Sequence, residues 1–112
     1  MFHLALASEW RAGWREGRYA PARFTDDGFV HCSEDEATAL KIAATHFAQV
    51  SGEVLVAELD EAALDVEVRR EEPSFPHVHG SIRASAVVRI GPLRRDPAGG
   101  WSWPTEWAYG KP

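Results

Sequence analysis

Five segments of the chain have the short apolar or alternating patterns that are typical of β-strands. They are FHLALA (2–7), GFVHC (28–32), EVLVAELD (53–60), VEVRREE (66–72) and SAVVRIGPLRR (85–95). Successive side chains of a strand point to opposite faces, so these patterns favour sheets that bury one face. The pattern is strongest in 53–60.

The first predicted helix is EWRAGWREG (9–17), which follows Ser8, a suitable capping residue, and ends at Gly17. Trp10 and Trp14 are four residues apart, and this spacing places them on one side of the helix.

A second helix is predicted over 34–47. Ser33 and Glu36 match the Ser-x-x-Glu pattern, in which each side chain caps the backbone of the other residue. Acidic residues at this end also suit the helix dipole. Apolar residues spaced by three or four predict the buried face, which comprises Ala37, Leu40, Ala44 and Phe47.

The remaining segments are rich in turn residues. We expect loops at 18–28 and 73–80, a helical turn at 61–64, and a turn-rich tail with three tryptophans at 97–112. The resulting order is β-α-β-α-β-β-β with antiparallel neighbours. It predicts an α+β fold, a single domain over 1–112 with a split antiparallel β-sheet and two main helices.

The composition is that of a domain with a substantial core. The chain has 112 residues, 45% of them hydrophobic, with five tryptophans and five phenylalanines. No apolar run approaches the roughly 20 residues of a membrane helix, and the first residues do not match a secretory signal. Cys32 is the only cysteine, so no internal disulfide can form. These features predict a cytoplasmic protein without membrane contact.

The formal net charge of −5 argues against an extended nucleic-acid surface. Such a surface needs a dense lysine and arginine face, whereas the basic residues here cluster only as the pairs 69–70 and 94–95. A local phosphate pocket built from one or two arginines stays open.

Histidines supply most of the candidate chemistry. His3, His31, His77 and His79 lie on predicted strands or at their ends, where sheet proteins commonly place ligands. Each one alone is better explained as an ordinary buried or surface imidazole, so only their grouping points to a site. His46 falls near the end of the second predicted helix, where the dipole already favours an imidazole, and we assign it no function.

The stretch GFVHCS (28–33) ends a predicted strand in three reactive side chains. Strand alternation directs His31 and Ser33 into a cleft, and Cys32 with Val30 into the core. Ser33 is interpreted either as a helix cap or as a ligand contact, and both roles can hold at once beside an anion or sugar hydroxyl. Cys32 is expected to be structural, because a buried thiol is a poor nucleophile.

The sequence lacks the usual metal and hydrolase motifs. CxxC, HxxxH, HExxH and GxSxG do not occur, and the only close pair of histidines is His77 with His79. We therefore predict no metal, and a metal-dependent hydrolase that uses His3, His31, His77 and His79 is the third hypothesis.

Several motifs together resemble one bacterial family. In chain order they are His3 in the opening strand, Trp10 in the first helix, Gly17-x-Tyr19, GFVHCS, ELD at 58–60 and FPHVHG at 75–80. In this order, over about residues 2–92, they resemble the uncharacterised family DUF952. That family is similar to the ADP-ribosyltransferase superfamily and, to some extent, to RNA 2′-phosphotransferases. The resemblance implies a split sheet that encloses a cleft for NAD.

The resemblance also implies roles for individual residues. His3 would hydrogen-bond the ribose on the nicotinamide side, and His31 with Ser33 would line the nicotinamide pocket. Many relatives have a catalytic glutamate at the third motif, where this chain has His77. Glu71 shortly before it would supply the negative charge that favours an oxocarbenium-like transition state.

Further residues complete the implied site. Glu72 is an alternative to Glu71, and His79 stands where the family usually has a tyrosine. Arg69 and Arg83 are candidates to bind the diphosphate. The leading hypothesis is therefore a domain that binds NAD or another ADP-ribose-containing ligand and transfers or hydrolyses it, with the acceptor unspecified. A non-catalytic module on the same fold, which binds a small ligand or a protein, is the alternative.

Overall fold

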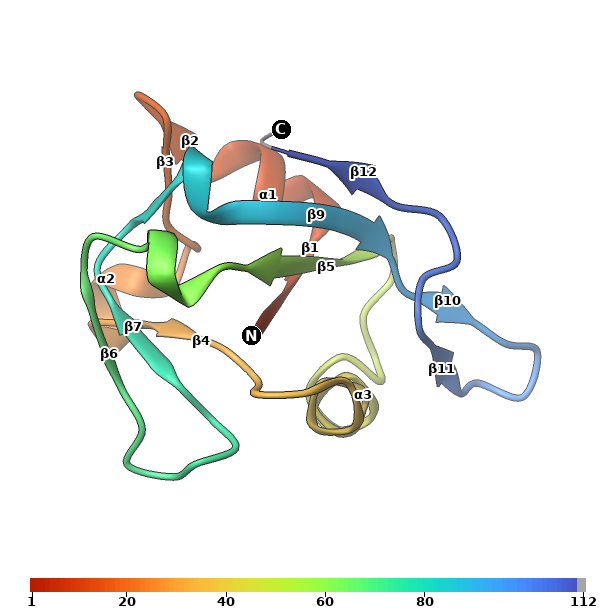
Figure 1. Ribbon diagram of the computed structural model, residues 1–112. Coiled ribbons are helices and arrows are strands. Elements are labelled where there is room, and N and C mark those ends of the chain that lie inside the picture. The colour runs from red at the N-terminus through yellow and green to blue at the C-terminus, as the bar shows by residue number, and fades with distance from the viewer. Residues whose placement is uncertain (111–112) are drawn as a thin grey trace.

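A four-stranded antiparallel sheet crosses the centre of the computed structural model, which describes residues 1–110 (Figure 1). In spatial order its strands are β1 (Phe2–Leu6), β5 (Val54–Leu59), β9 (Val87–Pro92) and β12 (Ala108–Tyr109). The predicted strands 2–7 and 53–60 thus correspond to β1 and β5, and the two pair directly.

Two smaller antiparallel sheets and a hairpin surround this centre. One sheet contains β2 (Trp14–Arg15), β3 (Arg18–Tyr19) and β8 (Ile82–Arg83), and the other contains β4 (Val30–His31), β7 (His77–His79) and β6 (Glu67–Arg69). The hairpin is formed by β10 (Arg94–Arg95) and β11 (Trp101–Ser102). The predicted loop 73–80 was therefore partly wrong, because its second half forms β7 between β4 and β6.

Three α-helices lie within residues 1–110, together with two short 3₁₀ turns. The helices are α1 (Ala7–Ala12), α2 (Phe24–Asp27) and α3 (Glu36–His46), and the 3₁₀ turns are η1 (Glu61–Ala63) and η2 (Ala84–Ala86). The fold class is α+β, as predicted, with three helices in place of two. In this part of the chain, no helix has the length and apolar character needed to cross a lipid bilayer.

Apolar side chains form two cores, one on each face of the four-stranded sheet. Beneath the sheet in Figure 1, α3 packs against it through Ala39 and Ala43, in a cluster with Leu4, Val54, Val56 and Leu93. The second core joins the sheet to α1 and the two smaller sheets, and includes Ala5, Trp10, Tyr19, Val30, Ala57, Val78 and Ile82. Helix α3 therefore packs on the opposite face of the four-stranded sheet from α1.

The outer edge of β1 is paired at only one end. Main-chain hydrogen bonds of 2.8 Å run in both directions between Phe2 and Ser33, just beyond β4. Residues along a strand turn their N–H and C=O groups alternately to the two sides. Because Phe2 turns these groups away from β5, Leu4 does so as well. Beyond Phe2 the edge of β1 separates from β4.

The first predicted helix was too long. Helix α1 begins at Ala7 without a side-chain cap, so Ser8 is not the capping residue, and the helix ends at Ala12. Glu16 and Gly17 both have positive φ, of 52° and 79°, and they form a two-residue turn that joins β2 to β3. Such turns match the twist of a hairpin, which explains why the chain turns back here.

The start and the buried face of the second helix also differ from the prediction. Asp35 caps α3, since its side chain accepts a hydrogen bond of 2.8 Å from the Thr38 N–H, and Ser33 instead pairs with β1. Within α3, Ala39 and Ala43 are buried, whereas the predicted Ala37 and Ala44 are exposed. The predicted Leu40 and Phe47 do pack against this core.

Candidate functional site

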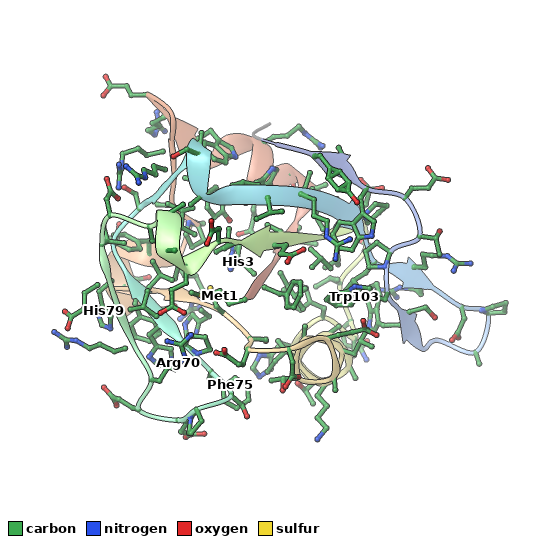
Figure 2. All side chains as sticks on the ribbon, in the orientation of Figure 1. Met1, His3, Arg70, Phe75, His79 and Trp103 are labelled. Carbon is green, nitrogen blue, oxygen red and sulfur yellow. The ribbon has the colours of Figure 1, made fainter. Side chains whose placement is uncertain are left out.

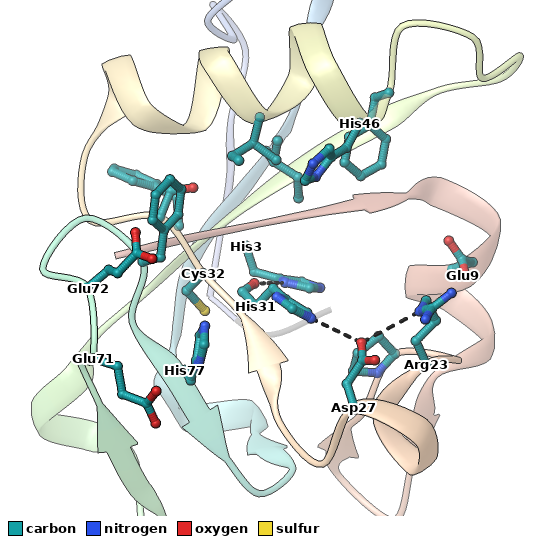
Figure 3. A pocket seen from close by; sticks show the side chains of 17 residues that line it. His3, Glu9, Arg23, Asp27, His31, Cys32, His46, Glu71, Glu72 and His77 are labelled. Carbon is teal, nitrogen blue, oxygen red and sulfur yellow. Dashed lines mark hydrogen bonds and ion pairs between the residues drawn. The ribbon is translucent and has the colours of Figure 1, made fainter.

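A cleft of about 800 Å³ runs along the open edge of β1 (Figure 3). Three residues of β1 line it, namely Phe2, His3 and Leu4. Other lining residues come from the last turns of α3, from α2 and β4, and from β7 and the segment before it. They include Ile42, His46, Phe47, Asp27, His31, Glu71, Glu72, Phe75 and His77. The cleft lies where β1 and β4 separate, so the split between the sheets creates it.

His3 lies in the floor of the cleft, and both of its ring nitrogens are hydrogen-bonded. Its Nδ1 lies 2.7 Å from the carbonyl oxygen of His31, and its Nε2 lies 3.1 Å from the Tyr19 hydroxyl. A carbonyl can only accept, so Nδ1 donates and Nε2 accepts from the hydroxyl. Burial lowers the pKa of His3 to about 4, which keeps the ring neutral at pH 7. His3 is 5% exposed and ties β1 to β3 and β4.

This bonding bears on the contact predicted between His3 and a ribose hydroxyl. A ligand would have to displace the Tyr19 hydroxyl or the His31 carbonyl to reach a ring nitrogen. Displacement would leave a buried polar group without its partner, at a cost of about 1–3 kcal/mol. The floor is therefore better suited to support the cleft than to bind a ligand through the imidazole.

His31 and Asp27 form the rim of the cleft. Helix α2 ends at Asp27, and Gly28 follows with φ +79°, donating its N–H to the Phe24 carbonyl at 2.8 Å. This left-handed residue reverses the chain into β4 and brings His31 back beside α2. His31 Nε2 then lies 3.0 Å from Asp27 Oδ2. That hydrogen bond is the main cause of the lowered pKa of Asp27, so its carboxylate is ionised at neutral pH.

His77 lies beside His31 in the sheet, since the two residues are register partners in β7 and β4. Its ring stacks on Phe29 with centroids 3.9 Å apart and 15° between the planes. Burial and, secondly, the nearby His31 lower the pKa of His77, so its ring is neutral at pH 7. The cleft therefore contains a neutral imidazole at His77 as well as at His3.

Cys32 and Ser33 also contact the cleft, and both are largely buried. Burial raises the pKa of the Cys32 thiol to about 12, so almost no thiolate forms near neutral pH. The expectation that Cys32 is buried beside Val30 is confirmed. Ser33 is fixed by its main-chain pairing with Phe2.

The cleft is acidic. Four carboxylates line it, those of Glu9, Asp27, Glu71 and Glu72, and within residues 1–110 only one arginine does. That arginine, Arg23, lies 3.6 Å from Asp27, so part of its charge is already balanced. A ligand with positive or developing positive charge is therefore favoured over a polyanion.

Three predicted ligand contacts lie outside the cleft lining. Arg69 pairs with Glu67 at 2.8 Å, and Arg83 donates to the Ala63 carbonyl at 2.6 Å. His79 shares the Phe29 face of β7 but lies towards the outer edge of the molecule, away from His3 (Figure 2). The diphosphate roles suggested for the two arginines thus gain no support from their positions.

Several lining residues were not predicted as part of a site, and two of them, His46 and Asp27, carry titratable groups that face His31. His46 lies across the cleft from His31, and Figure 3 shows its ring directed from α3 towards the cleft. Asp27 was taken only as part of a turn. A signal for Asp27 was present, because an aspartate followed by glycine stands four residues before His31. For His46 there was no such signal, since its place over the cleft depends on how α3 packs on β1.

The described residues contain no group of three or more histidine, cysteine, aspartate or glutamate side chains arranged to hold a metal ion. The hypothesis of a histidine-based metal hydrolase therefore has no set of metal ligands to support it within residues 1–110. The cleft is instead lined by four carboxylates and by the imidazoles of His31, His46 and His77, which can transfer protons or stabilise charge.

Antiparallel sheets that part around a cleft define the described part of the protein as an α+β domain with a concave candidate site. The chain belongs to the family described as "Protein of unknown function (DUF952)", whose model matches residues 4–90. No curated protein matches it.

Two solved structures have a similar fold. Both are X-ray crystal structures of protein CC0527 from Caulobacter crescentus, one of them a double mutant. The double mutant aligns with a TM-score of 0.70 and the other structure with 0.68. In both alignments the identity is 25%, over 90% of this chain and 91% of the other.

Proposed function

We propose that the cleft binds NAD through its nicotinamide and the adjoining ribose, and that the protein breaks the N-glycosidic bond between them. The observation that carries this proposal is the lining of the cleft, where carboxylates, aromatic rings and histidines surround about 800 Å³. Sites for small molecules commonly have roughly 300–1,000 Å³ and a few polar groups among apolar walls. The resemblance of DUF952 to the ADP-ribosyltransferase superfamily supports the same assignment.

The acidic lining suits this reaction. Breaking the bond to nicotinamide builds positive charge on the ribose ring, as in other sugar cleavages. Fixed negative charge near that ring lowers the free energy of the transition state. Glu71 and Glu72 line the cleft beside His77 and are the carboxylates proposed to act in this way. Phe2, Phe47 and Phe75 supply aromatic surface for the nicotinamide ring.

The same charges determine how the rest of NAD would lie. Arg23 is the only arginine that lines the cleft within residues 1–110, and it is shared with Asp27. Two phosphates would be repelled by the acidic interior. The proposal therefore places the diphosphate and adenosine at the mouth, with Arg23 as the nearest cation. This arrangement replaces the roles first suggested for Arg69 and Arg83.

Calorimetric titration of the full chain with NAD, nicotinamide riboside and ADP-ribose tests the proposal, with and without a chelator. NAD and nicotinamide riboside should bind, ADP-ribose should bind at least tenfold more weakly, and the chelator should have no effect. Nicotinamide release, followed by chromatography, then reports turnover. Glu71→Gln should weaken NAD binding by a factor of about 5, equivalent to roughly 1 kcal/mol. Glu106→Gln, at an exposed position outside the cleft, is the matched control.

The alternatives predict other outcomes. Binding without release of nicotinamide would favour a non-catalytic ligand-binding module. Binding that disappears with the chelator would favour a metal-dependent protein. No binding at millimolar NAD, or equal binding of ADP-ribose and nicotinamide riboside, would overturn the proposal.

A further inference from the structure

The hydrogen bond between Asp27 and His31 at the rim determines which ring nitrogen of His31 carries the proton. Asp27 is ionised and can only accept, so the hydrogen bond of 3.0 Å requires the proton on His31 Nε2. The lone pair of the neutral ring then lies on Nδ1. Within residues 1–110, Nδ1 of His31 has no hydrogen-bond partner. The side chain of His31 is 63% exposed and lines the cleft.

The carboxylate that orients this ring is itself fixed. The Asp27 side chain is only 19% exposed, compared with 63% for His31. It lies on the last residue of α2, and Arg23, one turn earlier, approaches the same oxygen, Oδ2, at 3.6 Å. Asp27 therefore has, besides His31, a second and longer contact from the start of its own helix.

The other histidines of the cleft lack this combination. Within residues 1–110 no carboxylate hydrogen-bonds the ring of His46. Both nitrogens of His3 are bonded within the floor. His77 is stacked on Phe29, and in the described part of the chain no carboxylate hydrogen-bonds its ring. A base needs an accessible lone pair and a partner that stabilises the imidazolium once the proton has arrived. His31 has both.

We propose that Asp27 and His31 form a carboxylate–imidazole dyad in which His31 Nδ1 is the general base of the cleft. This inference rests on the proposed function and deepens it by naming the proton acceptor. His31 is the catalytic residue, because it contacts the attacking group. Asp27 is a positioning residue, because it fixes the tautomer and ring orientation of His31.

In the simplest case the reaction is hydrolysis, with water as the nucleophile. The oxygen of a water molecule forms a bond to C1 of the ribose, and a proton of that water moves to His31 Nδ1. The bond from C1 to the nicotinamide nitrogen breaks, and its electron pair stays on nicotinamide, which leaves neutral. The Nε2–H of the His31 imidazolium stays hydrogen-bonded to the Asp27 carboxylate. The ring later releases the proton on Nδ1 to solvent. An acceptor hydroxyl could replace water without other change.

The tautomer of His31 can be measured without any ligand. Imidazole ¹⁵N chemical shifts of the labelled full chain above pH 7.5 should show His31 with its proton on Nε2. Asp27→Asn should give a mixture of tautomers, whereas Arg23→Gln, which alters only the second contact of Asp27, should keep the Nε2–H form. Diethyl pyrocarbonate should modify His31 several-fold more slowly in Asp27→Asn than in the parent, with His46 as the internal reference.

Turnover of NAD then tests the catalytic use of the dyad. General base catalysis contributes about 10²–10⁴-fold, so Asp27→Asn and His31→Gln should each lower nicotinamide release at least 100-fold. Asp27→Glu should restore part of the loss. A parent His31 with its proton on Nδ1, or full activity in Asp27→Asn, would overturn the dyad. Failure of the parent to bind NAD, with the expected tautomer and reactivity, would overturn the proposed function while supporting the dyad.

Discussion

The floor and the rim of the cleft hold two histidines in opposite states. His3 in the floor is 5% exposed and uses both ring nitrogens, whereas His31 at the rim is largely exposed and uses one. The two are linked directly, since the His31 carbonyl accepts the hydrogen bond from His3 Nδ1. Sharing a cleft therefore does not give histidines a shared role. The number of free ring nitrogens separates the supporting histidine from the reactive one.

Acidification should affect the floor most strongly. The pKa of His3 is about 4 in the folded protein, compared with 6.5 for an ordinary histidine, so the unfolded chain binds a proton that the folded chain excludes. The free energy of unfolding should therefore be undiminished above pH 6.5 and fall as the pH drops towards 4. The total loss is about 3 kcal/mol, at ~1.4 kcal/mol per pH unit. His77, whose pKa is also lowered, adds a smaller loss of the same sign.

Urea unfolding of the parent and of His3→Gln at several values between pH 7 and pH 5 measures this effect. The variant cannot titrate at position 3, so its stability should depend much less on pH, whatever its stability at pH 7. An equal dependence in both proteins would show that His3 is not the group responsible.

Tyr19→Phe should break the floor without altering the rim. Tyr19 is fully buried, and removal of its hydroxyl leaves His3 Nε2 as a buried acceptor without a donor. The free energy of unfolding should fall by about 1–3 kcal/mol. Tyr109→Phe, at a side chain that is 68% exposed, is the matched control and should be neutral. A neutral Tyr19→Phe would mean that the hydrogen bond in the floor contributes little.

The smallest effect concerns two structural polar residues just before α3, the exposed Asp35 and the buried Ser33. Asp35 is exposed but caps α3, so Asp35→Ala should cost about 1 kcal/mol of stability. Ser33→Ala should cost less than about 0.5 kcal/mol, because Ser33 contributes its main chain to the Phe2 pairing. Chemical unfolding of both variants gives the comparison. A larger loss of stability in Ser33→Ala than in Asp35→Ala would show that Ser33, and not Asp35, caps α3.

Local patterns in the sequence predicted the parts of the site that depend on a single strand. Alternation in GFVHCS placed Val30 and Cys32 in the core and His31 outside, and the structure agrees. The strand that carries His3 was predicted for the same reason. Alternation is a property of neighbouring residues, so it can be read without knowledge of the rest of the fold.

The rim could not be predicted in this way. Its geometry requires that α2 forms, that Gly28 adopts a left-handed conformation and that β4 returns beside the helix. Each step is weakly encoded, because a four-residue helix has little stability of its own. The bonding of His3 was hidden for another reason. Tyr19 lies 16 residues away and reaches the ring only through the β2–β3 hairpin.

The edge of β1 has a consequence for how the cleft can vary among related sequences. Leu4 lines the cleft and turns its main-chain N–H and C=O away from β5, on the same side as those of Phe2. One wall thus offers a donor and an acceptor that belong to the backbone. Substitutions at position 4 can reshape the cleft, but only proline deletes the donor. A ligand that is bound through these main-chain groups could therefore still bind after the side chain at position 4 has changed, whereas a ligand bound through that side chain could not.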